Sequence, residues 1–301
     1  MEWIILLVIV PVIVVPVVLL YGFAGCTFDP SVQPGNPPAP GPPATPTDLA
    51  ATATDLDRIA LAWAYLDPPP DAVKFQIQRT GGSPLPQPPL VTGTTFDDTG
   101  LDEGTTYVYQ VKAVRDSDGV ESELSDPADA TTLSFQSVFT TEGIPPSPSN
   151  GVDVNNDCIV QRITGINGSG IFVRITLRGI VNETTELTAV TISRAVPANA
   201  TQPWDSEETP VPVTFNGAAG VSVANGEAAV SDKISYAVSP GQDLHVAFDV
   251  SAGSGRVLRR NVTGQVAYTG SNRAEAGTMT RTAGFNTDNG RVYCIEAIEV
   301  A

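Results

Sequence analysis

Short runs of alternating hydrophobic residues, separated by turn-forming residues, constrain the fold of this chain most strongly. Leu61, Trp63 and Tyr65 occupy every second position of one run, and Phe75 and Ile77 repeat the spacing. A period of two is typical of a strand with one buried face. The 27 glycines and 26 prolines favour turns, and only 16% of the residues are charged, which disfavours a helical bundle. The sequence therefore predicts an all-β protein.

The charge balance limits the partners of the chain. The 33 acidic and 16 basic side chains give 301 residues a formal net charge of −17. A polyanion would be repelled, so nucleic acid is excluded as a partner. The length suits two domains, each with its own core. Three cysteines in a chain of this length argue against a disulfide scaffold or a zinc cluster.

The N-terminal segment is apolar from Trp3 to Leu20, which is long enough to cross a bilayer as a helix. It ends in Gly22-Phe23-Ala24-Gly25-Cys26, which resembles the lipobox of bacterial lipoproteins. The resemblance implies that residues 1–25 are removed and that Cys26 carries the lipid. An uncleaved membrane anchor and an ordinary signal peptide are the alternatives. Each of the three places the rest of the chain outside the cytoplasm, in or on a bacterial cell envelope, with the membrane as its partner.

A proline-rich linker is expected over residues 26–45. Eight of the 17 residues from Pro30 to Pro46 are proline, and none is charged. Such a segment forms no core and adopts extended polyproline II. The linker would therefore hold the following domains away from the membrane.

The first domain, residues 46–133, resembles a fibronectin type III domain. The resemblance rests on the opening Pro46–Ala51, on Trp63 and on the stretch Leu101–Tyr107, followed by alternating residues that include Tyr109. It implies a two-sheet sandwich with a tyrosine corner and a role as a spacer or adhesion module. We expect Trp63 in its core, and Asp97 and Asp98 as solvated loop carboxylates.

Residues 134–150 are expected to be a second linker, and residues 151–301 a jelly-roll-like β-sandwich. The segments expected as strands there are Cys158–Ile163, Ile171–Leu177, Leu187–Ile192, Val211–Phe215, Ala219–Val223, Leu244–Val250, Val262–Ala267 and Arg291–Val300.

Part of this second domain resembles the non-catalytic β-sandwich that precedes the catalytic domain in some SGNH (GDSL-type) esterases. The segments that carry the resemblance are Phe172–Leu177, Val213–Gly217, Val230–Asp232 and Pro240–Val246. The resemblance implies a domain that helps to hold a carbohydrate ester. No Gly-Asp-Ser-Leu block occurs in the chain.

Cys158 and Cys294 lie in the first and last strands expected for the second domain. Because terminal strands of sandwiches often pair and exported proteins keep disulfides, we predict a Cys158–Cys294 bridge. In the nearby loop, Asp153, Asn155 and Asp157 place oxygen ligands at alternate positions, as calcium loops do. A turn without metal is the alternative for this loop, and no other cofactor is expected.

His245, the single histidine, is a polar position in an alternating strand, so we expect it to face solvent. No Gly-x-Ser-x-Gly elbow accompanies it, and we therefore predict a chain that is not an enzyme. Exposed aromatic side chains bind sugars by stacking. Trp204, Tyr236 and Tyr268 are the candidate ligand-binding residues, with packing onto the sandwich as the alternative for Trp204.

Three hypotheses for function follow. The first is a non-catalytic surface lipoprotein whose second domain binds a polysaccharide or another surface protein, with the first domain as spacer. The second is a structural subunit of a surface fibre or appendage. The third is an accessory subunit of a carbohydrate esterase, in which His245 would act.

The lipobox hypothesis predicts the mass of the protein extracted from the cell envelope. Intact-mass spectrometry should find residues 1–25 absent and a diacylglycerol-sized addition on Cys26. A mass equal to the full unmodified sequence would instead establish the uncleaved anchor.

Overall fold

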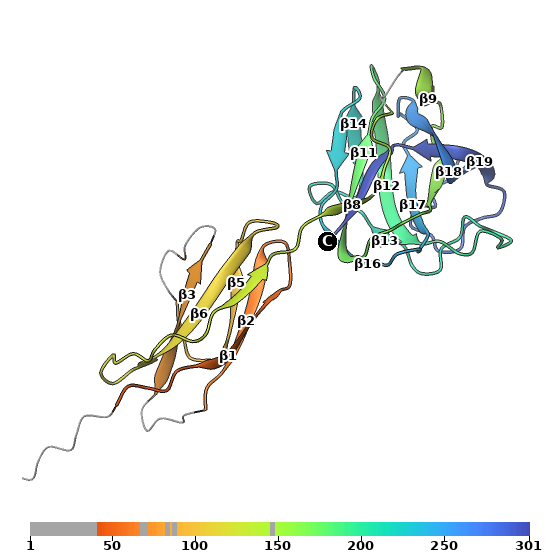
Figure 1. Ribbon diagram of the computed structural model, residues 1–301. Helices are drawn as coiled ribbons and strands as arrows, with labels where there is room; N and C mark the ends of the chain where they lie inside the picture. The colour runs from red at the N-terminus through yellow and green to blue at the C-terminus, as the bar shows by residue number, and fades with distance from the viewer. Residues whose placement is uncertain (1–40, 67–71, 82–84, 86–88, 145–147) are drawn as a thin grey trace, which may run out of the picture. The chain divides into compact units, whose positions relative to one another are not determined.

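The computed structural model describes residues 41–66, 72–81, 85, 89–144 and 148–301 (Figure 1). The only helix in these ranges is one short 3-10 helix, η1 (Pro148–Asn150), and all other regular elements are β-strands. The predicted all-β class is confirmed. The segment 1–25, Cys26 and most of the linker lie outside the described ranges. Within them, no helix is both long and apolar enough to cross a membrane.

The N-terminal sandwich contains a three-stranded and a four-stranded antiparallel sheet. The three-stranded sheet has the order β1 (Thr47–Ala53), β2 (Arg58–Ala64), β5 (Thr95–Thr99). The four-stranded sheet has the order β4 (Leu90–Val91), β3 (Val73–Thr80), β6 (Thr106–Arg115), β7 (Ala128–Thr131). Two packed sheets of this kind are the architecture expected from the fibronectin type III resemblance.

Alternation along the strands builds the core of this sandwich. Every second residue of β6, from Tyr107 onward, is buried, and Trp63 packs edge-on against Phe75 with ring centroids 5.4 Å apart. The Tyr107 hydroxyl accepts the backbone N–H of Asp102 at 2.9 Å. This bond is the predicted tyrosine corner, which fixes the chain as it enters β6.

Asp98 departs from the expectation of a solvated loop carboxylate. It lies in β5 with 3% exposure, ion-paired to Arg79 at 2.7 Å and accepting a hydrogen bond from the Tyr109 hydroxyl at 2.9 Å. Burial, together with the bond to Asp98, raises the pKa of Tyr109. The carboxylate is tolerated inside because both partners bond to it directly.

The C-terminal sandwich packs an eight-stranded sheet against a five-stranded sheet. The path of the larger sheet is β13 (Val211–Pro212), β12 (Thr184–Arg194), β17 (Leu244–Val250), β10 (Cys158–Ile163), β18 (Val257–Gly270), β19 (Asn286–Tyr293), with β14 (Val221–Ala224) beside β12 and β9 (Gly151–Val152) beside β18. The path of the smaller sheet is β15 (Ala228–Val230), β11 (Gly170–Arg178), β20 (Ile295–Val300), β8 (Gln136–Thr140), with β16 (Ile234–Val238) beside β11.

Several segments differ from the sequence expectation. Strands β9, β15 and β16 were not expected, and the strand expected over Val211–Phe215 is only Val211–Pro212. Residues 136–140, expected in a linker, form β8 and pair with β20 at the edge of the smaller sheet. The single strand expected over Arg291–Val300 is two strands, because the chain passes from the larger sheet to the smaller at Cys294. Cys294 has a left-handed φ of 52°, which is uncommon for a residue other than glycine and turns the backbone between the two sheets.

The predicted Cys158–Cys294 disulfide is wrong, because both thiols are free and buried. Cys158 pairs with Gly270 at one end of β18, whereas the Cys294 N–H bonds to the Leu258 carbonyl at the other end. At about 3.3 Å per residue the two cysteines are on the order of 35 Å apart, far beyond the roughly 7 Å between Cα atoms that a disulfide permits. They also lie on opposite faces of the larger sheet.

The free thiols make a direct prediction. Burial raises the pKa of Cys294 to about 12 and also raises that of Cys158, so neither thiol should react with iodoacetamide in the native protein. After unfolding without reductant, both should be alkylated, as read by peptide mass spectrometry. Recovery of a Cys158–Cys294 cross-linked peptide would contradict the structure.

Candidate functional site

The outer face of the eight-stranded sheet carries an unusual row in which four of five residues are polar, here called the polar row. Strand register places Ser193, His245, Arg162, Val266 and Asn289 side by side across β12, β17, β10, β18 and β19. Residues at alternate positions share a face of a sheet. The opposite face of the same strands packs against the smaller sheet. Both faces of β10 and β17 are buried. Other parts of the chain must therefore cover the part of the polar row that lies on these two strands.

Two loops provide that cover. Residues 195–210 and 271–285, here called the loop cover, pack Trp204, Ala276 and Phe285 onto the outer face of the sheet. The Trp204 ring stacks on Phe285 with centroids 5.6 Å apart and meets Tyr268 edge-on at 6.0 Å. Trp204 is therefore half-buried, with its ring between aromatic neighbours, and not an exposed platform.

Arg281 joins the two loops to each other. Its side chain, 2% exposed, donates to the backbone carbonyls of Trp204, Glu275 and Ala276 and to the Ser206 hydroxyl. Its own N–H bonds to the Asp205 carboxylate at 2.7 Å. A guanidinium has five donors in a planar fork, so one side chain can bond to carbonyls of both loops at once. The Trp204 carbonyl depends on Arg281, whereas the Glu275 and Ala276 carbonyls also accept bonds from Thr278 and Thr191.

His245 does not face solvent, and that expectation is wrong. Its side chain is fully buried beneath the loop cover, with the ring 6.3 Å from that of Tyr268. Neither ring nitrogen makes a hydrogen bond of normal geometry, although the Asp205 backbone approaches one of them. Burial, reinforced by Arg281 and Arg162, holds the pKa of His245 well below its usual range. The imidazole is neutral at pH 7.

Arg162 marks the point where the loop cover ends. Its side chain is 5% exposed and donates from Nε and Nη2 to Asp243 Oδ2, at 3.0 and 2.7 Å, while Nη1 donates to the Val196 carbonyl at 2.8 Å. Arg162 thus joins β10 by hydrogen bonds to Asp243, which precedes β17, and to Val196 of the loop cover. Burial raises the pKa of Tyr268, and Arg162 opposes that shift.

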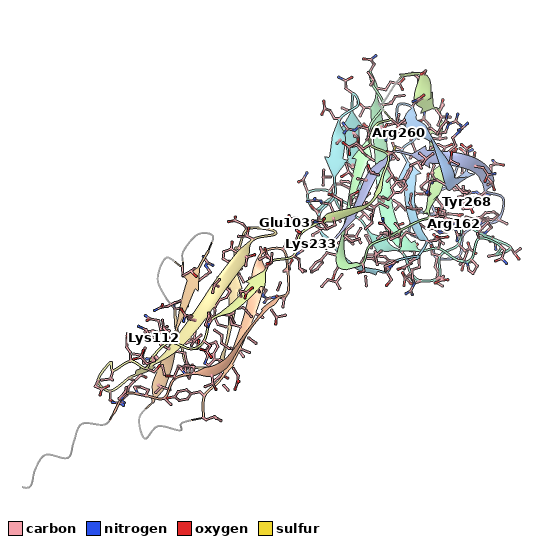
Figure 2. All side chains as sticks on the ribbon, in the orientation of Figure 1. Glu103, Lys112, Arg162, Lys233, Arg260 and Tyr268 are labelled. Atoms are coloured by element: carbon pink, nitrogen blue, oxygen red, sulfur yellow. The ribbon has the colours of Figure 1, made fainter. Side chains whose placement is uncertain are left out.

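Beside Arg162 the uncovered part of the sheet forms a depression of about 400 Å³, here called the outer pocket. Figure 2 shows Arg162 and Tyr268 close together on this sandwich. The pocket combines a guanidinium, a carboxylate, an amide and several hydroxyls within a few ångströms of an aromatic ring. Its lining residues are Arg162, Thr164, Ala198, Pro203, Asp243, Gly264, Val266, Tyr268, Thr287 and Asn289.

The three aromatic residues predicted to bind a ligand do not form one site. Tyr268 lines the outer pocket but is only 4% exposed, so it is not an exposed platform, and Trp204 packs behind it. Tyr236 lies in the core between the two sheets, where its hydroxyl donates to Glu208, so it is not an exposed ligand platform. Burial, together with Glu208, raises its pKa.

Arg162, Asp243, Thr287 and Asn289 were missed by sequence reasoning. Thr287 and Asn289 stand on β19 directly opposite Tyr268 and Val266, with exposed side chains. The signal in the sequence was that Thr287 and Asn289 are polar and two residues apart, which places them on one face of a strand. It could not identify a site, because three strands and the loop cover, from distant parts of the chain, contribute to the pocket.

The loop of the calcium hypothesis forms a turn. Asp153 accepts the N–H of Asn155 at 3.3 Å, and Asp157 accepts the N–H of Asn272 at 3.1 Å. Asn156 has the left-handed φ of 61° that a turn asparagine adopts. Among the described residues no three His, Cys, Asp or Glu side chains gather as a metal site. Calcium binding at Asp153, Asn155 and Asp157 stays a prediction.

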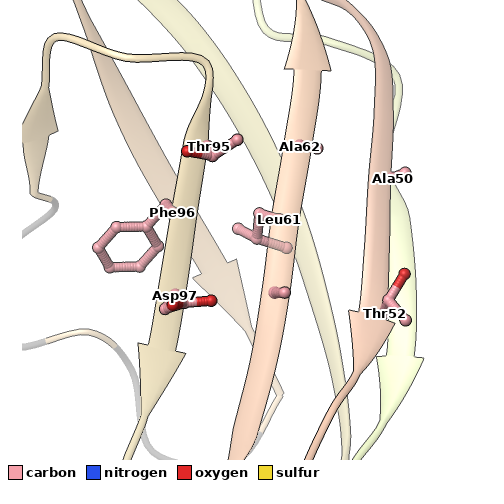
Figure 3. A pocket seen from close by; sticks show the side chains of 8 residues that line it. Ala50, Thr52, Leu61, Ala62, Thr95, Phe96 and Asp97 are labelled. Atoms are coloured by element: carbon pink, nitrogen blue, oxygen red, sulfur yellow. The ribbon is translucent and has the colours of Figure 1, made fainter.

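A larger depression of about 590 Å³ lies on the N-terminal sandwich, over strands β1, β2 and β5 (Figure 3). Small residues line most of it, such as Ala50, Thr52, Ala60 and Ala62. Asp97 at its side is ion-paired to Arg58 at 3.1 Å. It therefore offers few groups that can fix the orientation of a ligand.

Comparison with known proteins gives partial matches. The chain is 33% identical over 130 residues to chitinase 63 of Streptomyces plicatus, and 37% identical over 97 residues to a poly(3-hydroxybutyrate) depolymerase of Ralstonia pickettii. These matches take in 43% and 32% of this chain. The chain spans about a fifth of the length of these curated relatives (19% and 18%). No family model matches the sequence.

Solved structures similar to part of the chain are fibronectin type III domains. The crystal structure of a Fn3-like protein from Clostridium thermocellum is 30% identical, with 32% of this chain and 99% of that chain covered and a TM-score of 0.25. The FN5 domain of Drosophila Lar is 22% identical, with 31% and 98% covered and a TM-score of 0.26. The assignment of the N-terminal sandwich to the expected architecture therefore rests on its own strand order and its tyrosine corner.

The role of Arg281 predicts a large loss of stability in Arg281→Met. The substitution removes four hydrogen bonds within the loop cover and leaves the Trp204 carbonyl without its donor, so the free energy of unfolding should fall by on the order of 3 kcal/mol. Arg273→Met is the matched control, because Arg273 also donates to two carbonyls of the same loop but is only half-buried. That variant should lose less than about 1 kcal/mol. Equal urea-denaturation midpoints for the two variants would contradict the role of Arg281.

Proposed function

We propose that this chain is a non-catalytic cell-surface lipoprotein whose C-terminal sandwich binds an uncharged polysaccharide in the outer pocket. The lipid on Cys26, the proline-rich linker and the N-terminal sandwich hold that pocket away from the membrane. The observation that carries the proposal is the outer pocket itself, where Arg162 and Asp243 are fixed beside the exposed Thr287 and Asn289.

The chemistry of the pocket suits a sugar. Sugar hydroxyls both donate and accept hydrogen bonds, and the pocket offers a donor in Arg162, an acceptor in Asp243, and groups of both kinds in Asn289 and Thr287. Its volume of about 400 Å³ is within the range of small-ligand sites. Tyr268 adds the edge of an aromatic ring to the lining of the pocket.

Charge favours a neutral ligand. Arg162 and Asp243 compensate each other within the pocket, and the chain as a whole carries −17, which repels an anionic polymer. The similarity to chitinases supports a polysaccharide context. Chitin, an uncharged polymer, is therefore the first ligand to test.

The surroundings of His245 support a role without catalysis. A hydrolase of the serine class needs a base within hydrogen-bond reach of its nucleophile. The buried His245 makes no such bond to a hydroxyl or thiol. The accessory-esterase hypothesis thus loses the residue on which it depended.

The test is binding of the detergent-solubilised full chain to chitin oligosaccharides by calorimetry, with polygalacturonate as an anionic comparison. The chitin oligosaccharide should bind and the polygalacturonate should not. Asn289→Ala and Thr287→Ala should each weaken binding about 3- to 10-fold, the value of one lost hydrogen bond. Thr52→Ala, on the N-terminal sandwich, is the matched control and should leave the affinity unchanged.

Failure of every uncharged polysaccharide on a glycan array to bind would overturn the proposal. Ordered self-association of the purified chain without any ligand would favour the surface-fibre hypothesis instead.

A further inference from the structure

His245 is the single histidine of the chain, and it lies beneath the loop that forms one wall of the outer pocket. Ala198 and Pro203, on that wall, belong to the same loop as Asp205, whose backbone approaches the imidazole. The floor of the pocket is equally close, because His245 pairs with Arg162 across β17 and β10. His245 is thus next to residues of both the wall and the floor.

The charged groups that face the imidazole disfavour its protonated form. Arg162 faces it from β10, Arg281 from the loop cover, and the Tyr268 ring from β18. Residues directly opposite on neighbouring strands have Cβ atoms about 5 Å apart, and like charges at that distance are destabilising. A protonated His245 would be a third cation between two buried guanidinium groups.

The nearby carboxylates are already engaged. Asp243 binds Arg162, and Asp205 accepts the N–H of Arg281. Asp249 accepts the N–H groups of Glu275 and Ala276 and lies beside the Cys158 thiol, while Glu275 accepts the N–H of Thr282. None of these bonds can be given up to His245 without loosening the loop cover or its attachment to the sheet.

We propose that the outer pocket is acid-sensitive: protonation of His245 drives residues 195–210 away from Arg162, opens the loop cover and weakens ligand binding. Release of the loop breaks the bond from Arg162 Nη1 to the Val196 carbonyl and removes the pocket wall that Pro203 provides. The binding part of this inference rests on the proposed function, whereas the opening of the loop cover does not.

The direction of the pH dependence follows from linkage. The pKa of His245 is lowered in the closed state, and in an opened loop it should return to about 6.5. Above that pH neither state holds the proton, and the closed state keeps its full stability. Below it the open state gains a proton that the closed state does not accept, so opening becomes more favourable by about tenfold per pH unit.

Hydrogen exchange of the full chain tests the opening. Exchange of residues 195–210 is compared at pH 7.5 and pH 5.0, with the amides of β6 in the N-terminal sandwich as internal reference for the intrinsic pH effect. The wild type should show about a 30-fold rise in the opening equilibrium, and His245→Gln less than a twofold rise. An unchanged wild-type ratio would overturn the inference.

The single imidazole gives a second readout that needs no variant. Its NMR signal should remain that of a neutral ring until the loop signals change, and the two transitions should coincide. Free titration near pH 6.5 with an unmoved loop would overturn the inference.

Binding of a chitin oligosaccharide separates the two proposals. If it binds at pH 7.5 with equal affinity at pH 5.0, the acid-sensitive pocket is wrong and the proposed function stands. If it fails to bind at pH 7.5 while residues 195–210 still open in acid, the proposed function is wrong and the acid response stands.

Discussion

The hydrogen bonds of one buried guanidinium, that of Arg281, hold the loop cover on the C-terminal sandwich. Without them, the Trp204 carbonyl would lose its donor and residues 195–210 and 271–285 would lose side-chain bonds that join them, and an unsatisfied polar group costs more than a typical bond contributes. With them, the two loops act as a third layer over the eight-stranded sheet. That layer buries the outer face of β10 and β17, so both faces of these strands are interior. A row of polar residues such as the one on this outer face is unusual for a core.

The edge of the loop cover creates the outer pocket. Across the polar row, Ser193 and His245 lie beneath the loops, Arg162 lies at their margin, and Asn289 is open to solvent. The same row is therefore structural at one end and available to a ligand at the other. Arg162 connects the two ends, because its guanidinium binds a carboxylate of the pocket and a carbonyl of the loop cover.

Local signals in the sequence predicted local structure well. The alternation around Trp63 and the stretch that ends at Tyr107 correctly indicated the strands of the N-terminal sandwich and its tyrosine corner. The alternation of β17 also marked His245 correctly as facing away from the inter-sheet core. Its burial depends on Arg281 and Trp204, which lie 36 and 41 residues away and show no strand or helix periodicity.

The errors share a physical cause. The disulfide prediction assumed that the first and last strands meet at Cys158 and Cys294, but that depends on the sheet in which each strand lies. The turn at Cys294 moves the chain from one sheet to the other. Strand order and layer assignment are set by contacts between distant residues, so a pattern within ten residues could not reveal them. The same limit hid the outer pocket, which three strands and the loop cover build together.

The location of ligand binding is the central claim, and NMR chemical-shift mapping tests it most directly. Amide signals of the full chain are followed while a chitin oligosaccharide is added. The account predicts the largest shifts at Arg162, Tyr268 and Asn289, with little change in the N-terminal sandwich. Shifts confined to residues 50–62 and 95–97, which line the depression on that sandwich, would contradict it.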